Sequence, residues 1–226
     1  MLRISRQTKI SIVEDPFLSI EGEGIHIGKP MTFIRLARCN LRCVWCDTKY
    51  SWEEGQNYSV TDLVNKLDML GCINIGLTGG EPLLQPNGVL ELLKSIHNKI
   101  TYLNTNGTIW NKRIFDKVNW INCDIKTPSS GMKSNSTIIN NLVRNYPKKL
   151  QLKIVVMPED LRFTRSLLDK ISTDIPVTIQ PEFNSYSGSI TVDLFMLIIN
   201  NFKERKNIRV LPQLHKILWP NIDRGI

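Results

Sequence analysis

The sequence has no long hydrophobic run. Its longest apolar stretch near the C-terminal end, Leu194 to Ile199, is far shorter than the roughly 20 residues that a membrane-spanning helix needs. The first residues, Met1 to Glu14, alternate charges with short apolar groups and lack the continuous apolar segment of a secretory signal. We therefore expect a soluble, cytoplasmic protein with no membrane partner.

Cysteine is also scarce. The five cysteines are an odd number, and without a secretion signal they are not expected to form a disulfide framework. Cys39, Cys43 and Cys46 form a tight trio, for which metal binding is the natural interpretation. Cys72 and Cys123 are isolated in apolar surroundings, where we expect each to be a small core residue.

Acidic residues are outnumbered, since 29 Lys and Arg against 21 Asp and Glu give a formal net charge of +8. A charge of this sign raises the question of a nucleic-acid partner. The basic residues are scattered, however, and only small clusters such as Lys148-Lys149 and Lys203 to Lys206 stand out. We expect a solvated basic surface that attracts small anionic substrates and makes no direct contact with nucleic acid. RNA binding stays open as an alternative.

The length of 226 residues and a hydrophobic content of 42% fit one domain spanning 1–226. Apolar, often β-branched runs alternate with segments of helical spacing such as Leu63/Leu67/Leu70. This alternation predicts βαβ units and an α/β fold with a mainly parallel sheet. The runs expected to be strands are Met31–Ala37, Ile73–Thr78, Ile100–Thr105, Trp120–Ile125, Gln151–Met157, Val177–Gln180 and Ile208–Leu211.

Turn residues directly follow several of these runs. Gly79-Gly80, Asn106-Gly107, Pro128 to Ser130 and Pro181 each stand where an expected strand ends. Ligands of parallel α/β folds gather at the carboxyl ends of the strands. The sequence therefore predicts one site assembled from several loops.

The cysteine trio begins on the loop that leaves the Met31–Ala37 strand. Three thiolates on one short loop can hold three corners of a cubane cluster. A structural zinc site would usually need a fourth Cys or His nearby. His26, His97 and His215 are all distant in the sequence, although one of them could fold in.

The spacing C-x3-C-x2-C, with Trp45 in the second gap, resembles the signature of radical S-adenosylmethionine (SAM) enzymes. The resemblance implies a partial TIM-type barrel of parallel strands with surrounding helices. It also implies a 4Fe-4S cluster on Cys39, Cys43 and Cys46 whose open iron binds the methionine end of the cofactor. One electron then cleaves the sulfonium and releases a 5′-deoxyadenosyl radical.

A second motif, Thr78 to Pro82, follows the next expected strand. Its two glycines let the backbone approach a ligand closely, and the Glu81 carboxylate can pair with an ammonium group. Alone, Gly-Gly-Glu-Pro could be an ordinary strand-to-helix turn. After the cysteine trio it resembles the methionine-binding loop of the superfamily.

Short stretches along nearly the whole chain, in order, resemble the 7-carboxy-7-deazaguanine synthases of the 7-deazapurine pathway. They are Ser19 to Gly24, Arg35, Cys46 to Tyr50, Thr78 to Gln85, Thr105 to Thr108, Cys123 to Met132, Gln180-Pro181 and Val210 to Lys216. The resemblance implies conversion of 6-carboxy-5,6,7,8-tetrahydropterin to 7-carboxy-7-deazaguanine, with ring contraction and release of ammonia. The product would serve queuosine, archaeosine or another deazapurine.

The same resemblance implies three groups of site residues besides the cluster ligands. Those expected to bind the pterin substrate are Ile20, Glu21, Gly22, Glu23, Arg35 and Thr78. Those expected to bind SAM are Trp45, Cys46, Asp47, Gly80, Glu81, Asp124, Ile125, Lys126, Gln180, Pro181, Glu182 and Phe183. Thr48 is the expected protein ligand of Mg²⁺, an ion that favours oxygen ligands and retains water.

Chemistry supports these substrate assignments. The planar guanidinium of Arg35 can hold a substrate carboxylate through two hydrogen bonds, and Glu21 and Glu23 can accept from the NH groups of a pterin edge. Two departures from the family pattern are Glu21, where glutamine is common, and Asn104, where an acidic residue is frequent. An ionised carboxylate can only accept, whereas an amide can also donate. We assign no catalytic role to His215.

The resemblance further implies a flavodoxin or ferredoxin as electron donor, and a homodimer. Two other functions remain open from the sequence. A glycyl-radical activase would share the cysteine trio and the Gly-Gly-Glu-Pro loop, but it would not need Arg35, Thr48 or the Pro212 to Lys216 stretch. A non-catalytic zinc or iron–sulfur module would need only the cysteines.

Overall fold

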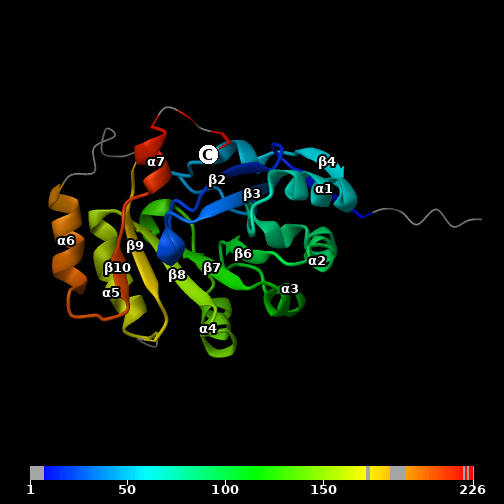
Figure 1. The fold of residues 1–226 in the computed structure, drawn as a ribbon. Coiled ribbons are helices and arrows are strands. Elements are labelled where there is room, and N and C mark those ends of the chain that lie inside the picture. The colour runs from blue at the N-terminus through cyan, green and yellow to red at the C-terminus, as the bar shows by residue number, and fades with distance from the viewer. Residues whose placement is uncertain (1–7, 172–173, 184–191, 221, 223, 226) are drawn as a thin grey trace, which may run out of the picture.

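The computed structural model describes residues 8–171, 174–183, 192–220, 222 and 224–225 (Figure 1). Its strands form one curved sheet in the order β10-β9-β8-β7-β6-β5-β3-β1-β4, with β2 paired to β3. The strands are β1 (Lys9–Ile12), β2 (Phe17–Ile20), β3 (Pro30–Leu36), β4 (Gln56–Ser59), β5 (Asn74–Gly79), β6 (Ile100–Thr105), β7 (Trp120–Ile125), β8 (Leu150–Val156), β9 (Val177–Pro181) and β10 (Ile208–Val210).

Seven strands, β3 and β5 to β10, run parallel to one another. β1, β2 and β4 add antiparallel pairs on the other side of β3. Because β10 and β4 end the sheet without pairing to each other, the barrel is not closed. The expected α/β fold, a partial TIM-type barrel of parallel strands with surrounding helices, is confirmed.

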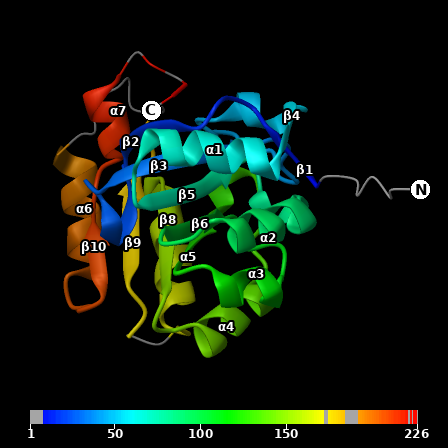
Figure 2. The ribbon, with the colours of Figure 1, turned by 45° about the vertical axis from the view of Figure 1, so that its right-hand side comes forward.

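Helices follow most of the parallel strands and cover the outside of the sheet (Figures 1 and 2). The α-helices are α1 (Val60–Leu70), α2 (Pro86–Ser95), α3 (Lys112–Lys117), α4 (Ser136–Asn145), α5 (Leu161–Leu168), α6 (Val192–Phe202) and α7 (Leu214–Leu218). The short 3₁₀ helices are η1 (Gly24–His26), η2 (Lys49–Trp52), η3 (Pro82–Leu84), η4 (Pro128–Ser130) and η5 (Pro158–Asp160).

Local sequence sets the helix ends. The Ser59 side chain accepts a hydrogen bond from the backbone N–H of Asp62 at the start of α1, and Gly71 ends that helix with a φ of 68°. A left-handed residue at this position is far easier for glycine than for any other residue. Between these ends, Leu63 and Leu67 are fully buried against the outer face of the sheet, as their helical spacing predicts.

The inside of the barrel is apolar at one end and polar at the other. Met31, Phe33 and Tyr102 form a small buried cluster towards the start of their strands. His26 packs edge-on against the rings of Tyr102 and Trp120 and closes this end further. Because this end is filled with side chains, a ligand can enter the barrel only from the carboxyl ends of the strands.

The C-terminal helix α7 returns to the N-terminal part of the chain. The backbone N–H of Leu214 donates to the carbonyl of Gly22, 2.9 Å away. A side chain at Gly22 would force His215 to shift, because a Cβ atom would lie 2.3 Å from its Nδ1. The loop that follows β2 is therefore packed tightly under α7.

All five cysteines are free thiols. Cys123 is fully buried in the core, as expected. The expectation for Cys72 was wrong: its side chain is only partly buried, with its sulfur 3.4 Å from the carbonyl of Pro30, because the turn after α1 runs along the surface. Within the described residues, no helix combines the length and the hydropathy that crossing a membrane requires.

Candidate active site

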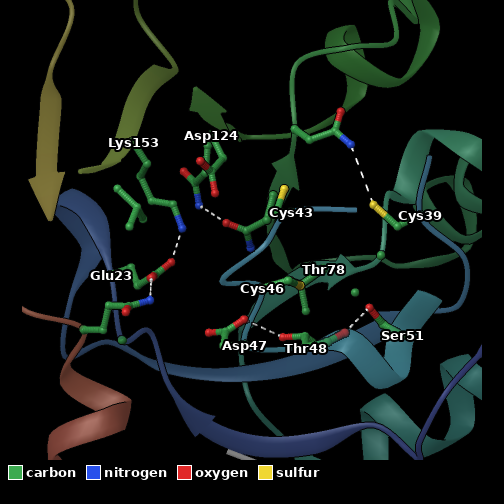
Figure 3. Close-up of a pocket in the computed structure, with 18 of the residues that line it drawn as sticks. Glu23, Cys39, Cys43, Cys46, Asp47, Thr48, Ser51, Thr78, Asp124 and Lys153 are labelled. Carbon is green, nitrogen blue, oxygen red and sulfur yellow. Dashed lines mark hydrogen bonds and ion pairs between the residues drawn. The ribbon is translucent and has the colours of Figure 1, made fainter. Parts of the chain in front are cut away.

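A pocket opens at the carboxyl ends of the parallel strands, where the cysteine loop, the loop after β2 and the residues before α7 meet (Figure 3). All three cysteines of the trio and all six expected substrate residues line it. The predicted residues that line the pocket are Ile20, Glu21, Gly22, Glu23, Arg35, Cys39, Cys43, Trp45, Cys46, Asp47, Thr48, Thr78, Gly80, Asp124, Lys126 and Glu182.

Five expected SAM-binding residues do not line this pocket. Ile125 is fully buried within the hydrophobic core, and Gln180 and Pro181 are buried at the end of β9. Phe183 is partly buried, and Glu81 is fully buried. Side chains alternate between the two faces of a strand, so a motif read along the chain includes residues that point away from the ligand.

The cysteine loop is anchored at both ends. It begins at Arg38, whose φ of 71° is a strained value for a non-glycine residue. Backbone bonds hold Arg38 there: its N–H donates to the carbonyl of Ser51 and its carbonyl accepts from the N–H of Glu81. Further along the loop, the N–H of Val44 donates to the carbonyl of Ser130. The thiols are thus carried by a backbone fixed to three other loops.

The donor set suits an iron–sulfur cluster. Three thiols line one pocket, and the backbone N–H of Leu41 lies 3.4 Å from Sγ of Cys39. Burial raises the pKa of Cys46 to about 11 and also raises that of Cys43, so these thiols keep their protons near neutral pH until a bound metal displaces them. Within the described residues, no three His, Cys, Asp or Glu side chains already stand in a metal-binding arrangement.

The Gly79-Gly80 pair joins the cysteine loop to the next strand. A Cβ atom on Gly80 would lie 1.9 Å from the carbonyl oxygen of Arg38, and one on Gly79 would lie 2.1 Å from that of Leu36. Only glycine fits at either position, and the exposed backbone can approach a ligand. Gly80 therefore stays a candidate for holding the cofactor through its main chain.

Glu81 does not line the pocket, and its carboxylate is bonded to neighbouring loops. Its carboxylate accepts hydrogen bonds from the backbone N–H groups of Leu83 and Asn106 and from the hydroxyl of Thr105. It is fully buried, and burial raises its pKa to about 7. The carboxylate therefore braces the two loops from below, whereas an ammonium group in the pocket would not reach it.

Asp124 and Lys126 form a partly buried ion pair at the end of β7, with Nζ and Oδ2 3.0 Å apart. Burial would lower the pKa of Lys126, but the neighbouring Asp124 carboxylate outweighs this effect and raises it. The other oxygen of Asp124, Oδ1, is buried without a hydrogen-bond partner, and Asp124 itself lines the pocket. An orphaned acceptor of this kind suits a hydroxyl or amino group of a nucleoside cofactor such as SAM.

Thr48 stands directly before η2, but its hydroxyl makes no capping hydrogen bond to that helix. It donates to Oδ1 of Asp47 at 2.8 Å, which leaves its lone pairs for a cation. Asp47 also faces His215, with Oδ2 and Nε2 3.6 Å apart. Burial alone would raise the pKa of Asp47, yet the contact with His215 holds it well below its ordinary value. The oxygen donors at this corner fit Mg²⁺.

The substrate loop carries two acidic residues that line the pocket and differ in their pKa, the buried Glu21 and the partly buried Glu23, whose side chain faces Lys153 (Figure 3). Glu23 pairs with Lys153 and accepts a hydrogen bond from Nε2 of Gln213 at 2.7 Å. Burial would raise the pKa of Glu23, but Lys153 lowers it overall, so the side chain is charged. Glu21 has no such partner: its Oε2 is buried without a hydrogen bond, and burial raises its pKa to about 7.

The raised pKa of Glu21 bears on the departure from the family pattern. Around neutral pH a large fraction of this carboxyl is protonated, so it can donate through its O–H as well as accept. A glutamine amide has the same two capacities. The exchange of glutamine for glutamate therefore preserves the hydrogen bonding that this position offers to a ligand.

A stability measurement tests this protonation. An acid whose pKa is raised on folding contributes stability below its ordinary pKa of 4.5, and this contribution is lost as the pH rises through about 7. Glu21→Gln has no such loss. We expect the variant to gain about 2–3 kcal/mol of unfolding free energy over the wild type at pH 8.5 and to match it at pH 4.5.

Urea unfolding at the two pH values measures this difference. Glu54→Gln, at an exposed position, is the matched control and should show no pH-dependent gain. Parallel stability profiles for Glu21→Gln and the wild type would contradict the protonation of Glu21.

Arg35 lies in the pocket wall on β3, between the rings of Phe17 and Tyr50, with its Cζ atom 5.5 and 5.8 Å from their centroids. Its Nε donates to Oε1 of Glu14 at 2.7 Å. The guanidinium is therefore oriented by the two aromatic rings and by the carboxylate of Glu14. Its role as the partner of a substrate carboxylate stays a prediction.

Sequence reasoning missed several residues of the site. Lys153, Asn122 and Gln213 line the pocket, as do Asn104, which was noted only as a departure, and His215. Lys153 did carry a signal, because it is the only charged residue within the apolar run Gln151–Met157. A lysine inside a central strand has to meet an acid or a ligand, and here it meets Glu23.

Comparisons with known proteins agree with this geometry. The model of the Radical SAM superfamily matches residues 33–156. A 7-carboxy-7-deazaguanine synthase of Thermoplasma acidophilum is 33% identical, and the match covers 93% of this chain and 98% of that protein. A 7-carboxy-7-deazaguanine synthase of Clostridium acetobutylicum is also 33% identical, and the match covers 95% of this chain and 98% of that protein.

Among solved structures, the crystal structure of QueE from Escherichia coli matches with a TM-score of 0.65 at 23% identity. The match covers 92% of this chain and 95% of that one, which supports the similarity of fold. The relatives agree with the deazaguanine-synthase resemblance and not with a glycyl-radical activase or a metal-binding module.

Proposed function

Because the chain belongs to the radical SAM superfamily and, within it, to the 7-carboxy-7-deazaguanine synthases, we propose how its own residues serve that reaction. The enzyme converts 6-carboxy-5,6,7,8-tetrahydropterin to 7-carboxy-7-deazaguanine with ring contraction and release of ammonia. Its cofactors are a 4Fe-4S cluster, SAM and Mg²⁺. When bound, the cluster and SAM would supply the electron and the radical that begin the reaction, and Mg²⁺ would hold substrate oxygens in place.

One observation carries the assignment of residues. The three thiols, the Glu21–Glu23 loop, Arg35 and Thr48 come from distant parts of the sequence and line one pocket. In this proposal Cys39, Cys43 and Cys46 hold the cluster, and Thr48 is the protein ligand of Mg²⁺. The remaining residues bind and orient the two organic molecules and exclude water.

The cofactor side of the pocket is formed by Trp45, Asp47, Gly80, Asp124, Lys126 and Glu182. The unpartnered Oδ1 of Asp124 accepts from the cofactor, and the Lys126 ammonium stands 5.5 Å from the Trp45 ring, which holds both side chains in place. Ile125, Gln180, Pro181 and Phe183 support this wall from behind. Glu81 acts in the same way, through the loops that it braces.

The substrate side is formed by Ile20 to Glu23, Arg35 and Thr78. The charged Glu23 accepts from ring NH groups of the pterin, and Glu21, whose pKa is raised by burial, can donate when protonated as well as accept. Arg35 holds the substrate carboxylate. The pterin is therefore fixed at both ends, so that one carbon faces the radical.

Several wider features belong to the same proposal. The chain acts as one domain, 1–226, in the cytoplasm, with a flavodoxin or ferredoxin as electron donor and as a homodimer. It acts on a small molecule and needs no direct contact with nucleic acid, although its product serves a tRNA modification pathway such as queuosine biosynthesis. The net charge of +8 suits anionic substrates.

The test of the function is a reconstitution assay. Purified anaerobic protein with iron and sulfide restored is given SAM, 6-carboxytetrahydropterin, Mg²⁺ and a reductant. The deazaguanine acid should form, as measured by liquid chromatography and mass spectrometry. If the protein cleaves SAM but never consumes the carboxypterin, the assignment of the substrate is wrong.

The magnesium role of Thr48 leads to a separate prediction. Replacing Thr48 by valine removes the hydroxyl but no capping hydrogen bond, so the melting temperature should change little. Product formation should fall by about 10- to 100-fold, as is typical when a metal site loses a contributing group. Thr48→Ser keeps the oxygen and should stay within a few fold of the wild type.

Activity measured against Mg²⁺ concentration distinguishes the two variants. For Thr48→Val the half-activating concentration should rise. Unchanged Mg²⁺ dependence in both variants would show that Thr48 is not a ligand.

A further inference from the structure

Three amides, two of them buried and the third partly buried, form a chain across the inside of the barrel. Asn104 on β6, Asn122 on β7 and Gln151 on β8 are register partners on neighbouring strands. Nδ2 of Asn122 donates to Oδ1 of Asn104 at 2.9 Å, and Nε2 of Gln151 donates to Oδ1 of Asn122 at 2.7 Å. The chain ends outside the sheet, where the backbone N–H of Ile25 donates to Oε1 of Gln151 at 2.8 Å.

The anchor at Ile25 fixes the direction of the whole chain. A backbone N–H can only donate, so it requires an oxygen from Gln151, which then turns its NH₂ group to Asn122. Asn122 in turn directs its own NH₂ group to Asn104. Reversing any one amide would set two donors or two acceptors against each other in an interior where Asn122 is 1% exposed and Gln151 is fully buried.

Asn104 is the free end of the chain. Its oxygen is used by Asn122, and its side chain lines the pocket. Within the described part of the chain, its Nδ2 atom donates to no protein acceptor. The NH₂ group therefore faces the pocket as a donor. Its orientation is set by the backbone N–H of Ile25, through Gln151 and Asn122.

We propose that Asn104 is a specificity-determining residue that donates a hydrogen bond to an oxygen of the bound pterin. Asn122 and Gln151 are positioning residues that keep the NH₂ group, and not the oxygen, turned to the substrate. This inference rests on the proposed function. It makes this position a hydrogen-bond donor, whereas an ionised acidic side chain in the same place could only accept.

The anchor also joins two walls of the pocket. Ile25 directly follows the Glu21–Glu23 loop, and a Cβ atom on Gly24 would lie 2.6 Å from the amide of Gln151. The loop is thus seated on the same amide that starts the chain. A pterin held by Glu21 and Glu23 on one side and by Asn104 on the other contacts both ends of one hydrogen-bonded unit.

The first experiment separates a donor from an acceptor at position 104. Binding of 6-carboxypterin to the reconstituted enzyme with SAM and Mg²⁺ is measured by calorimetry for the wild type, Asn104→Leu and Asn104→Asp. Loss of the donor should weaken binding by about 10-fold in Asn104→Leu, and added repulsion should weaken it by up to about 100-fold in Asn104→Asp. Asn140→Asp, the same change on the exposed face of α4, should bind like the wild type.

The second experiment tests the positioning role. Asn122→Leu frees the Asn104 amide to turn and should weaken binding several fold in the wild-type background. In an Asn104→Leu background the same change should have no further effect, because the group that it orients is gone. Melting temperatures identify any variant that fails to fold, in which case the variants at position 104 still decide the donor.

The outcomes are distinct. If the wild type neither binds 6-carboxypterin nor forms the deazaguanine acid from 6-carboxytetrahydropterin, the proposed function fails. If the wild type binds it and Asn104→Asp binds equally well or more tightly, Asn104 is not a donor and this inference is overturned. If Asn122→Leu weakens binding equally in both backgrounds, Asn122 acts on its own and the orienting chain is wrong.

Discussion

Replacing Cys43 by serine should abolish product formation and leave the protein with little iron. The three cysteines are the only cluster ligands that the loop offers, and the bound cluster should give about four iron atoms per chain in the reconstituted wild type. Cys43 is the most buried of the three, so no solvent-derived group can easily take its place. Iron and sulfide analysis and the visible absorption spectrum of anaerobic protein measure the loss.

Cys72→Ser is the matched control for this experiment. It makes the same exchange of sulfur for oxygen at a partly buried position outside the pocket, and it should keep the iron content and the activity of the wild type. If Cys43→Ser retains a full cluster and forms product, the cluster is not held by the trio. If the wild type contains zinc in place of iron, the assignment of an iron–sulfur cluster to the trio is wrong.

The second large effect is expected at Lys153. Its ammonium group is buried against the carboxylate of Glu23, with the carboxyl of Glu21 nearby. Lys153→Met removes the only cation paired with Glu23 among the described residues. Loss of one partner from a buried pair destabilises a protein by about 3–5 kcal/mol. The melting temperature should therefore fall by roughly 10 °C.

The double variant Glu23→Gln/Lys153→Met separates stability from function. It removes both charges but keeps an oxygen at position 23 for Nε2 of Gln213, so most of the stability should return. Binding of 6-carboxypterin should stay impaired, because the charged acceptor is gone. Lys112→Met, which breaks an exposed ion pair with Asp116, is the control and should cost less than about 1 kcal/mol.

The pH dependence of stability gives an independent check of the same pair. The pKa of Glu23 is lowered from its ordinary value of 4.5, so its contribution is present above that pH and is lost as the pH falls through the folded value. Burial would lower the pKa of Lys153, but Glu23 raises it overall above 10.5, so its contribution is lost only at higher pH. The pair therefore stabilises the fold between about pH 4.5 and 10.5. If Lys153→Met lowers the free energy of unfolding by a similar amount at every pH, this account of the pair is wrong.

Much of the fold could be predicted from apolar runs. β6 and β7 begin and end where the sequence places them, because both faces of each strand are covered and four of the six residues in each are buried. β1, β2 and β4 were not predicted. β4, Gln56–Ser59, is polar and half-exposed, and its strand conformation depends on pairing with β1, which no local pattern reveals.

The site was predictable to the extent that its motifs lie directly after strands. Motif position indicates which loop reaches the pocket but not which way each side chain points. Glu81 illustrates the limit, because its neighbour Gly80 lines the pocket while its own carboxylate turns inwards to Thr105 and Asn106. The partner of Lys153 lies 130 positions away, a distance over which one sequence carries no pairing information.

The contact between α7 and the substrate loop also affects when the site can exist. Gln213 and Glu23, which share a hydrogen bond across the pocket, are 190 positions apart in the chain. At a synthesis rate of about 5–20 residues per second, the cysteine loop waits on the order of 10 s for the residues that close its surroundings. The side of the pocket that Glu23 and Gln213 share is therefore completed only after the residues before α7 have been synthesised.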